Sequence, residues 1–169
     1  MLRPIVRYPA AGLQTPSARV DAFDAGLNRL IDDMIDTMYA APGIGLAAPQ
    51  VGVSLRVCVI DLSVGRQGGE LHVLVNPEFV EREGMQLEEE GCLSVPGFNA
   101  TVARPAKVTV RAQDRKGESR EITGTGLLAR ALQHEIDHLD GSLFLDRLRG
   151  IKRELITRKI RKLQRAGRW

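Results

Sequence analysis

The feature that most constrains the fold is the run HEIDH at residues 134–138, which fits the pattern H-E-x-x-H. Residues four apart on a helix lie on one face, a single turn apart. A helix would therefore place the imidazoles of His134 and His138 where both can bind one metal ion, with the carboxylate of Glu135 beside it. The motif predicts a helix that carries a metal site.

The residues around the motif indicate an amphipathic helix. At about 100° per residue, one arc of roughly 160° holds the apolar face together with the motif. That arc contains Leu127, Leu128, Ala131, Leu132, His134, Glu135, His138 and Leu139. We expect the opposite side, with Arg130, Gln133 and Asp137, to face solvent. Burying two imidazoles and a carboxylate without partners costs about 2 kcal/mol or more each. A metal would supply those partners, and hydrogen bonds within the core are the alternative.

Length and composition fit one globular domain. The chain has 169 residues, enough to bury a sizeable core. Residues 1–12 lack the apolar stretch of a secretory signal, and no apolar run approaches membrane-spanning length. Two cysteines, Cys58 and Cys92, are too few for a disulfide framework. We therefore expect a cytoplasmic protein with neither a membrane nor DNA as a partner.

Charge is distributed unevenly along the chain. Residues 147–169 contain ten Lys or Arg residues and one acid, Glu154, so this tail carries +9. The whole chain carries +3, which leaves −6 on the remainder. A basic tail on an acidic body indicates that the tail could meet a polyanion, although most charge runs are solvated helix faces.

The order of predicted elements favours an α+β fold. Short strands precede the metal helix, so we expect mostly antiparallel sheets packed around a central metal-binding helix, with one helix before them and a basic one after. The predicted elements are a helix from Asp21 to Pro42-Gly43, strands at 56–62, 71–76 (ending at Pro77), 78–90, 107–113 and 118–122, the metal helix closed by Gly141, and a basic helix over about 149–165 with an apolar stripe of Ile151, Leu155, Ile156, Ile160 and Leu163.

A third protein ligand is needed for a catalytic metal that keeps one position open. The metzincin pattern would place a histidine three residues after Gly141, where this chain has Phe144. A thermolysin-like arrangement would use Glu154, twenty residues after His134, although its basic neighbours favour a surface ion pair. Cys92 is the third candidate.

Three segments together resemble the motifs of a known family. GIGLAAPQ at residues 43–50, EGCLS at 90–94 and HEIDH at 134–138 are similar, in order, to the three motifs of peptide deformylase. This resemblance spans nearly the whole chain and favours Cys92 over Glu154 as the third ligand. It implies hydrolysis of the N-formyl group from the formyl-methionine of new peptides. It also implies Fe²⁺ as the native ion, and the same ligands suit Zn²⁺, Co²⁺ or Ni²⁺.

The resemblance also implies roles for individual residues. Glu135 would act as general base and acid, and the Gln50 amide and Leu93 backbone N–H would stabilise the oxyanion. The substrate main chain would pair with Ile44, Gly45 and Gly91, which gives the glycine-rich segment 43–52 a purpose. A phosphate-binding loop is the rival for that segment, but its lysine-serine ending and following helix are missing.

The methionine side chain would enter a pocket with Leu127 and Ala131 in its wall, judged from the helix face. Where some relatives have an arginine after the cysteine motif, this chain has Phe98-Asn99-Ala100. We expect residues 1–148 to form the catalytic unit and residues 149–169 a basic helix packed on it. By resemblance that helix would dock on the ribosome, through ribosomal RNA. A thermolysin-like peptidase and a ribosome-associated module with a structural metal are the alternatives.

Overall fold

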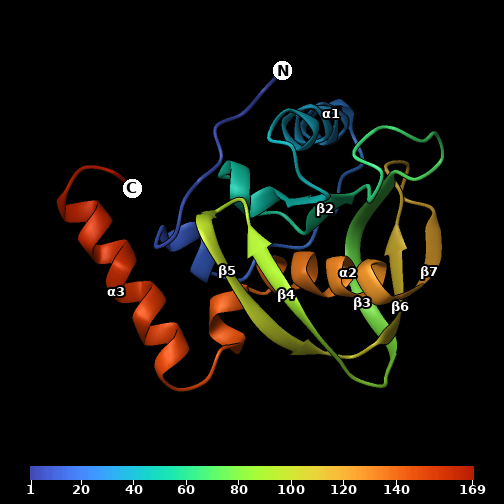
Figure 1. The fold of residues 1–169 in the computed structure, drawn as a ribbon. Coiled ribbons are helices and arrows are strands. Elements are labelled where there is room, and N and C mark those ends of the chain that lie inside the picture. Colours follow the sequence, from blue (N-terminus) through green and yellow to red (C-terminus); the bar gives the residue numbers. More distant parts are fainter.

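The computed structural model covers residues 1–169 and contains three helices and two antiparallel sheets (Figure 1). The helices are α1 (Ala25–Ala40), α2 (Gly126–Leu139) and α3 (Ile151–Arg165). The five-stranded sheet has the order β1 (Gly45–Ala47), β2 (Val57–Ile60), β3 (His72–Glu83), β6 (Lys107–Gln113) and β7 (Ser119–Thr125), and the two-stranded sheet pairs β4 (Gln86–Cys92) with β5 (Val95–Arg104). Short 3-10 turns lie at Ala11–Gln14, Ala48–Val51 and Phe144–Arg147. The expected α+β class with antiparallel sheets is confirmed.

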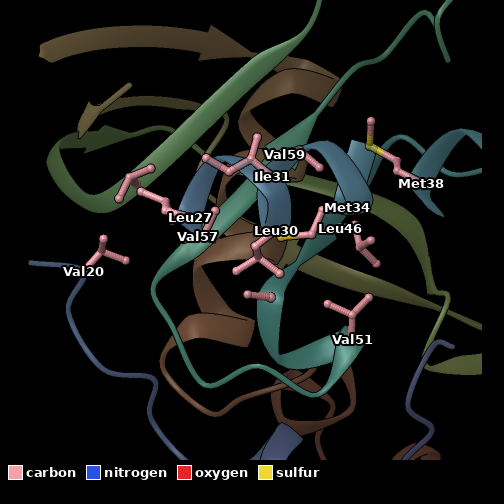
Figure 2. Close-up of a cluster of buried hydrophobic side chains, with 12 residues drawn as sticks. Val20, Leu27, Leu30, Ile31, Met34, Met38, Leu46, Val51, Val57 and Val59 are labelled. Atoms are coloured by element: carbon pink, nitrogen blue, oxygen red, sulfur yellow. The ribbon is translucent and has the colours of Figure 1, made fainter. Parts of the chain in front are cut away.

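Helix α1 covers one end of the five-stranded sheet with an apolar face. Its buried residues Leu27, Leu30, Ile31, Met34 and Met38 meet Leu46, Val57 and Val59 of β1 and β2 in one core cluster (Figure 2). The helix begins at Ala25 rather than at the predicted Asp21, because the Asp24 side chain accepts a hydrogen bond from the Leu27 backbone N–H (2.9 Å).

The strands after residue 70 differ from the prediction at two places. The predicted division of residues 71–90 is wrong, because β3 continues through Pro77 to Glu83 and the strand expected over 78–90 is instead interrupted at Gly84 and Met85, before β4. The register with β6 shifts between Val75 and Glu78, and a proline without an N–H is tolerated at such a bulge. The second difference is β5, which was not predicted, and which pairs with β4 to form a separate hairpin.

Helix α2 lies between the two sheets. Ala129, Ala131, Leu132, Ile136 and Leu139 pack on strands of the five-stranded sheet. The opposite face was expected to be in solvent, and this prediction is wrong. Arg130, Gln133 and Asp137 are only 3–6% exposed, because the β4–β5 hairpin covers them. Leu127, expected on the buried face, is 53% exposed in the first turn of α2.

Helix α3 is held more loosely. Of its predicted apolar stripe only Ile160 is fully buried. Ile156 and Leu163 are half-buried, and Ile151 and Leu155 are 67% and 44% exposed. No helix in the chain combines the length and the hydropathy that crossing a bilayer requires.

Candidate metal centre and its pocket

Three side chains with metal-binding atoms meet at one point. Cys92 is the last residue of β4, whereas His134 and His138 lie one turn apart on α2. Their sulfur and nitrogen atoms all lie within 4.8 Å of one another, and the Cys92 Sγ is 3.3 Å from the His138 Nε2. His138 is fully buried and His134 is 9% exposed. The fold therefore brings together residues that are 42 and 46 positions apart in the sequence.

The chemistry of this set suits a divalent metal. A thiolate and two imidazoles are preferred ligands of Zn²⁺, Fe²⁺ and Co²⁺, and three protein ligands leave a position open. Burial and the neighbouring His134 hold the pKa of His138 well below its usual value, so its ring is neutral and can donate an electron pair. Without a metal, the Cys92 Sγ has only weak hydrogen-bond partners, which are the His138 Nε2 at 3.3 Å and the Gln50 Nε2 at 3.6 Å. The residues present therefore fit a metal ion.

Glu90 orients the first of the two histidines. Its Oε1 is 2.7 Å from the His134 Nδ1, which leaves the His134 Nε2 as the ligand atom. Glu90 is itself clamped by the buried Arg104, which donates from two nitrogens at 2.6 and 2.7 Å, and by Arg130. Burial tends to raise the pKa of Glu90, but the hydrogen bonds from Arg104 and His134 outweigh it and lower that pKa.

Arg104 also binds Asp137, the fourth residue of the HEIDH motif. Its second terminal nitrogen donates to Asp137 at 2.9 Å, and Asp137 accepts two further bonds from Arg147 at 2.6 and 2.7 Å. We call Glu90, Arg104, Arg130, Asp137 and Arg147 the ion network. Sequence reasoning missed it because its members come from four separate segments and no spacing relates them.

Glu135 lies on the pocket side of α2. Its Oε1 is buried without a hydrogen-bond partner. Burial raises the pKa of Glu135 to about 7, against the opposing charge of His134. A Cβ added at Gly45 would collide with the Glu135 carboxylate, so the glycine in β1 makes the room that this side chain occupies. An unpaired buried carboxylate with this pKa is suited to exchange a proton with a bound molecule.

Gln50 lies on the other side of the cluster, in the 3-10 turn after β1. Its Oε1 accepts from the Ala47 backbone N–H at 3.0 Å. Its Nε2 donates to the Ser94 hydroxyl at 3.1 Å and is 3.6 Å from the Cys92 sulfur. These bonds fix which end of the amide faces the cluster, so Gln50 presents N–H groups to it.

A cavity of about 420 Å³ opens over the cluster. It lies between β1, which is one of the two edge strands of its sheet, and β4, which has one unpaired edge. Its wall contains every residue predicted to contact substrate, which are Ile44, Gly45, Gly91, Leu127 and Ala131, together with Gln50, Cys92, Leu93, His134 and Glu135. His138 lies behind this wall, fully buried.

Neither of the two rejected positions supplies a third ligand. Glu154 is exposed on α3 and pairs with Arg158 at 2.7 Å, as its basic neighbours indicated. Phe144, at the metzincin position, is buried with its ring stacked on His134 at a centroid distance of 6.4 Å. Neither residue belongs to the metal-binding group.

Comparison with known proteins gives one consistent answer. The polypeptide deformylase family model matches residues 2–154. A peptide deformylase of Acidobacterium capsulatum is 56% identical over 169 residues, which cover all of this chain and 99% of that protein. The crystal structure of a peptide deformylase from Legionella pneumophila superposes with a TM-score of 0.92 at 51% identity, over 99% of this chain and 98% of that one.

A third relative was solved with a ligand. The peptide deformylase from Ehrlichia chaffeensis, in complex with actinonin, has a TM-score of 0.90 at 38% identity and covers 97% of this chain and 98% of its own. Sequence and fold are thus matched from end to end by the same kind of protein. The chain belongs to the polypeptide deformylase family, whose members are metalloenzymes that remove N-formyl groups from nascent peptides.

Proposed function

We propose that this chain hydrolyses the formyl-methionine end of newly made peptides to formate and a free amine, using one divalent metal held by Cys92, His134 and His138. The observation that supports this best is the position of the three ligand atoms beneath an open cavity, with an unpaired carboxylate beside them. The metal would supply a Lewis acid that makes water nucleophilic near neutral pH and polarises an amide carbonyl.

The proton is moved by Glu135. Its carboxylate accepts a proton from the attacking water and delivers it to the departing amine nitrogen. The raised pKa of Glu135, about 7, matches both halves of that transfer near neutral pH. Burial without a competing donor keeps its Oε1 free for this purpose.

The developing oxyanion is stabilised by the chain's own N–H groups. Gln50 Nε2 is aimed at the cluster by the bonds to Ala47 and Ser94, and the backbone of Leu93 borders the same cavity. Removing one such donor typically lowers kcat by about 10²–10³. We propose these two groups as the oxyanion donors.

The peptide is bound as an added strand. The unpaired edges of β1 and β4 border the cavity at Gly45 and Gly91, with Ile44 just before β1, and backbone pairing there accepts any sequence. Leu127 and Ala131 line the side of the cavity nearest the start of α2, and we assign the methionine side chain to them. The half-exposed Leu127 would lose its contact with water when this side chain enters.

The native metal and the second partner rest on the family resemblance. We propose Fe²⁺ as the native ion, with Zn²⁺, Co²⁺ or Ni²⁺ as occupants of the same ligands. We also propose residues 1–148 as the catalytic unit and residues 149–169 as a ribosomal RNA contact. In support, a hollow on α3 is lined only by cationic side chains, which are Arg158, Lys159, Arg161, Lys162 and Arg165.

The catalytic proposal is tested by anaerobic purification, metal analysis and formate release from formyl-Met-Ala-Ser. We expect Glu135→Gln to retain one metal per chain while kcat falls by about 10²–10⁴. Cys92→Ala should lose the metal, and Glu154→Gln should keep both metal and turnover. Metal loss in Glu154→Gln, with retention in Cys92→Ala, would instead support the thermolysin-like peptidase.

The RNA contact is tested separately by reversing charges on α3. Replacing three residues of α3 with Glu, namely Lys159, Arg161 and Lys162, should weaken ribosome binding at low salt. Formate release from the tripeptide should stay unchanged. Ribosome binding that survives this change, or that does not weaken as salt rises, would refute a contact through α3.

A further inference from the structure

A single aromatic side chain joins the end of α3 to the wall of the cavity. After Arg165 the chain reverses at Gly167, whose φ of +67° is left-handed, and the Arg168 N–H donates to the Leu163 carbonyl at 2.9 Å. This reversal turns the chain back from α3 toward the body (Figure 1) and brings Trp169 onto it. The indole N–H of Trp169 donates to the Tyr8 carbonyl at 2.6 Å.

The indole makes two further contacts. Its ring meets that of Phe98 at a centroid distance of 5.9 Å and an angle of 60°, which is a favourable tilted geometry. The Arg7 guanidinium lies over the ring, 5.7 Å from its centroid. Trp169 is therefore held by a hydrogen bond, an aromatic pair and a cation, although it lies outside α3.

Both of its main partners lead to the cavity. Phe98 follows Pro96 and Gly97 in β5, and those two residues line the cavity wall. Tyr8 donates its own N–H to the Ser94 carbonyl at 2.9 Å. Ser94 itself lies between Leu93 and Pro96, which both line the cavity wall. Residues 94–98 are thus held at one end by the hydrogen bond between Tyr8 and Ser94, and at the other by the contact between Phe98 and Trp169.

Little else ties α3 to this wall. Ile160 is the one fully buried side chain of the helix, and Leu155 and Ile151 are turned to solvent. Besides Trp169, the apolar contacts of α3 with the body come from Ile160 and the half-buried Ile156 and Leu163. Trp169 therefore adds a contact between the end of α3 and residues next to the cavity wall.

We propose that Trp169 is a positioning residue for peptide binding, which fixes residues 94–98 through Tyr8 and Phe98 and so sets the affinity of the cavity for its substrate. Trp169 does not line the cavity and touches no substrate. Its effect should fall on KM, which reports how well the wall fits the peptide, rather than on the proton transfer at Glu135. The proposal rests on the function proposed above.

The test compares Trp169→Ala and Trp169→Phe with Arg168→Ala, an exposed neighbour, in the metal-loaded full chain with formyl-Met-Ala-Ser. The full energy of such an aromatic pair corresponds to about 13-fold at most, and it reaches KM only as far as the pair holds the wall in its binding conformation. Trp169→Ala should therefore raise KM by about 2- to 13-fold and leave kcat within about twofold. Trp169→Phe keeps the ring against Phe98 and should recover much of the loss. Arg168→Ala should match the parent. An unchanged KM in Trp169→Ala, or a fall in kcat alone, would overturn the proposal.

Two readouts separate this proposal from other failures. Trp169 is the only tryptophan, so the emission of the parent protein reports this residue alone. Adding the product peptide Met-Ala-Ser should shift that emission or its quenching by acrylamide, and an unresponsive emission would count against the coupling. If the parent releases no formate, the proposed function fails and this inference with it. If the parent is active and Trp169→Ala behaves identically, only this inference fails.

Discussion

Replacing Arg104 with Met should destabilise the protein strongly. Arg104 is the largest side chain with no exposed surface, and it bridges Glu90 and Asp137, whose side chains are 5% and 9% exposed. Methionine keeps most of the apolar stem but removes the charge and three hydrogen bonds. Removing one partner of a buried ion pair typically costs about 3–5 kcal/mol, because the remaining charge stays buried.

The magnitude should lie at the lower end of that range. Glu90 keeps Arg130 and His134 after the substitution, and Asp137 keeps the two bonds from Arg147. Neither carboxylate is left wholly unpaired, so we expect a loss of about 3 kcal/mol. In a domain of this size each kcal/mol lowers the melting midpoint by about 2–4 °C, which gives a shift of roughly 6–12 °C.

Urea unfolding of parent and variant, each loaded with the same metal, measures this loss. Arg111→Ala is the matched control, because Arg111 makes only surface pairs at 3.4–3.6 Å and should change stability by about 0–1 kcal/mol. Repeating the comparison in excess chelator removes any effect of altered metal affinity. If Arg104→Met costs no more than Arg111→Ala in both conditions, the ion network does not stabilise the fold as argued.

Two further changes test the site and the loop beside it. Gly45→Ala should displace the Glu135 carboxylate and lower kcat by about 10²-fold while the metal content stays at the parent level, which metal analysis and formate release would show. Burial tends to raise the pKa of Asp61, but hydrogen bonds from Ser63, Tyr39 and Gly65 outweigh it, and its folded pKa lies below 3.8. Its stabilisation is therefore complete well above pH 3.8 and is lost as the pH falls through the folded value. The stability difference between parent and Asp61→Asn should be larger at pH 6 than near pH 3.

Local patterns predicted the elements that depend on local structure. Strand β6 was predicted with the bounds it has, Lys107–Gln113, since its residues alternate between the core and the surface. Helix α2 was predicted because apolar spacing over more than three turns specifies a helix whatever packs on it. Strand β5 escaped prediction although its residues alternate between a core cluster and the surface from Phe98 onward, because Pro96 and Gly97 interrupt the pattern near its start and its last buried residue is the charged Arg104.

Sequence spacing predicted only part of the candidate ligand set. The helical period placed His134 and His138 together, and Phe144 excluded the metzincin pattern, but spacing alone left Glu154 and Cys92 as rivals for the third position. Resemblance to a family favoured Cys92, and the fold shows why local reasoning could not. The thiol reaches His138 across 46 residues because β4 ends beside α2, a tertiary fact that no helix periodicity contains.

The prediction that one face of α2 lies in solvent was wrong for the same reason. Arg130, Gln133 and Asp137 look like an ordinary hydrated stripe, and helix geometry put them on one face correctly. Helix periodicity does not show which other part of the chain packs against that face. Arg104 meets Asp137 from 33 residues away, and Arg130 meets Glu90 from 40 residues away.

A helix can be buried on all sides only if every polar residue on it finds a partner elsewhere. On one side of α2 the apolar residues pack on the five-stranded sheet, and on the other the ion network neutralises Asp137 and Glu90. His134 stands at the boundary, bonded to Glu90 and facing Cys92. The same arginines that make the burial of α2 tolerable thus hold the residue that orients this histidine. A loss of Arg104 should therefore weaken metal retention as well as folding, by about 10- to 100-fold in affinity.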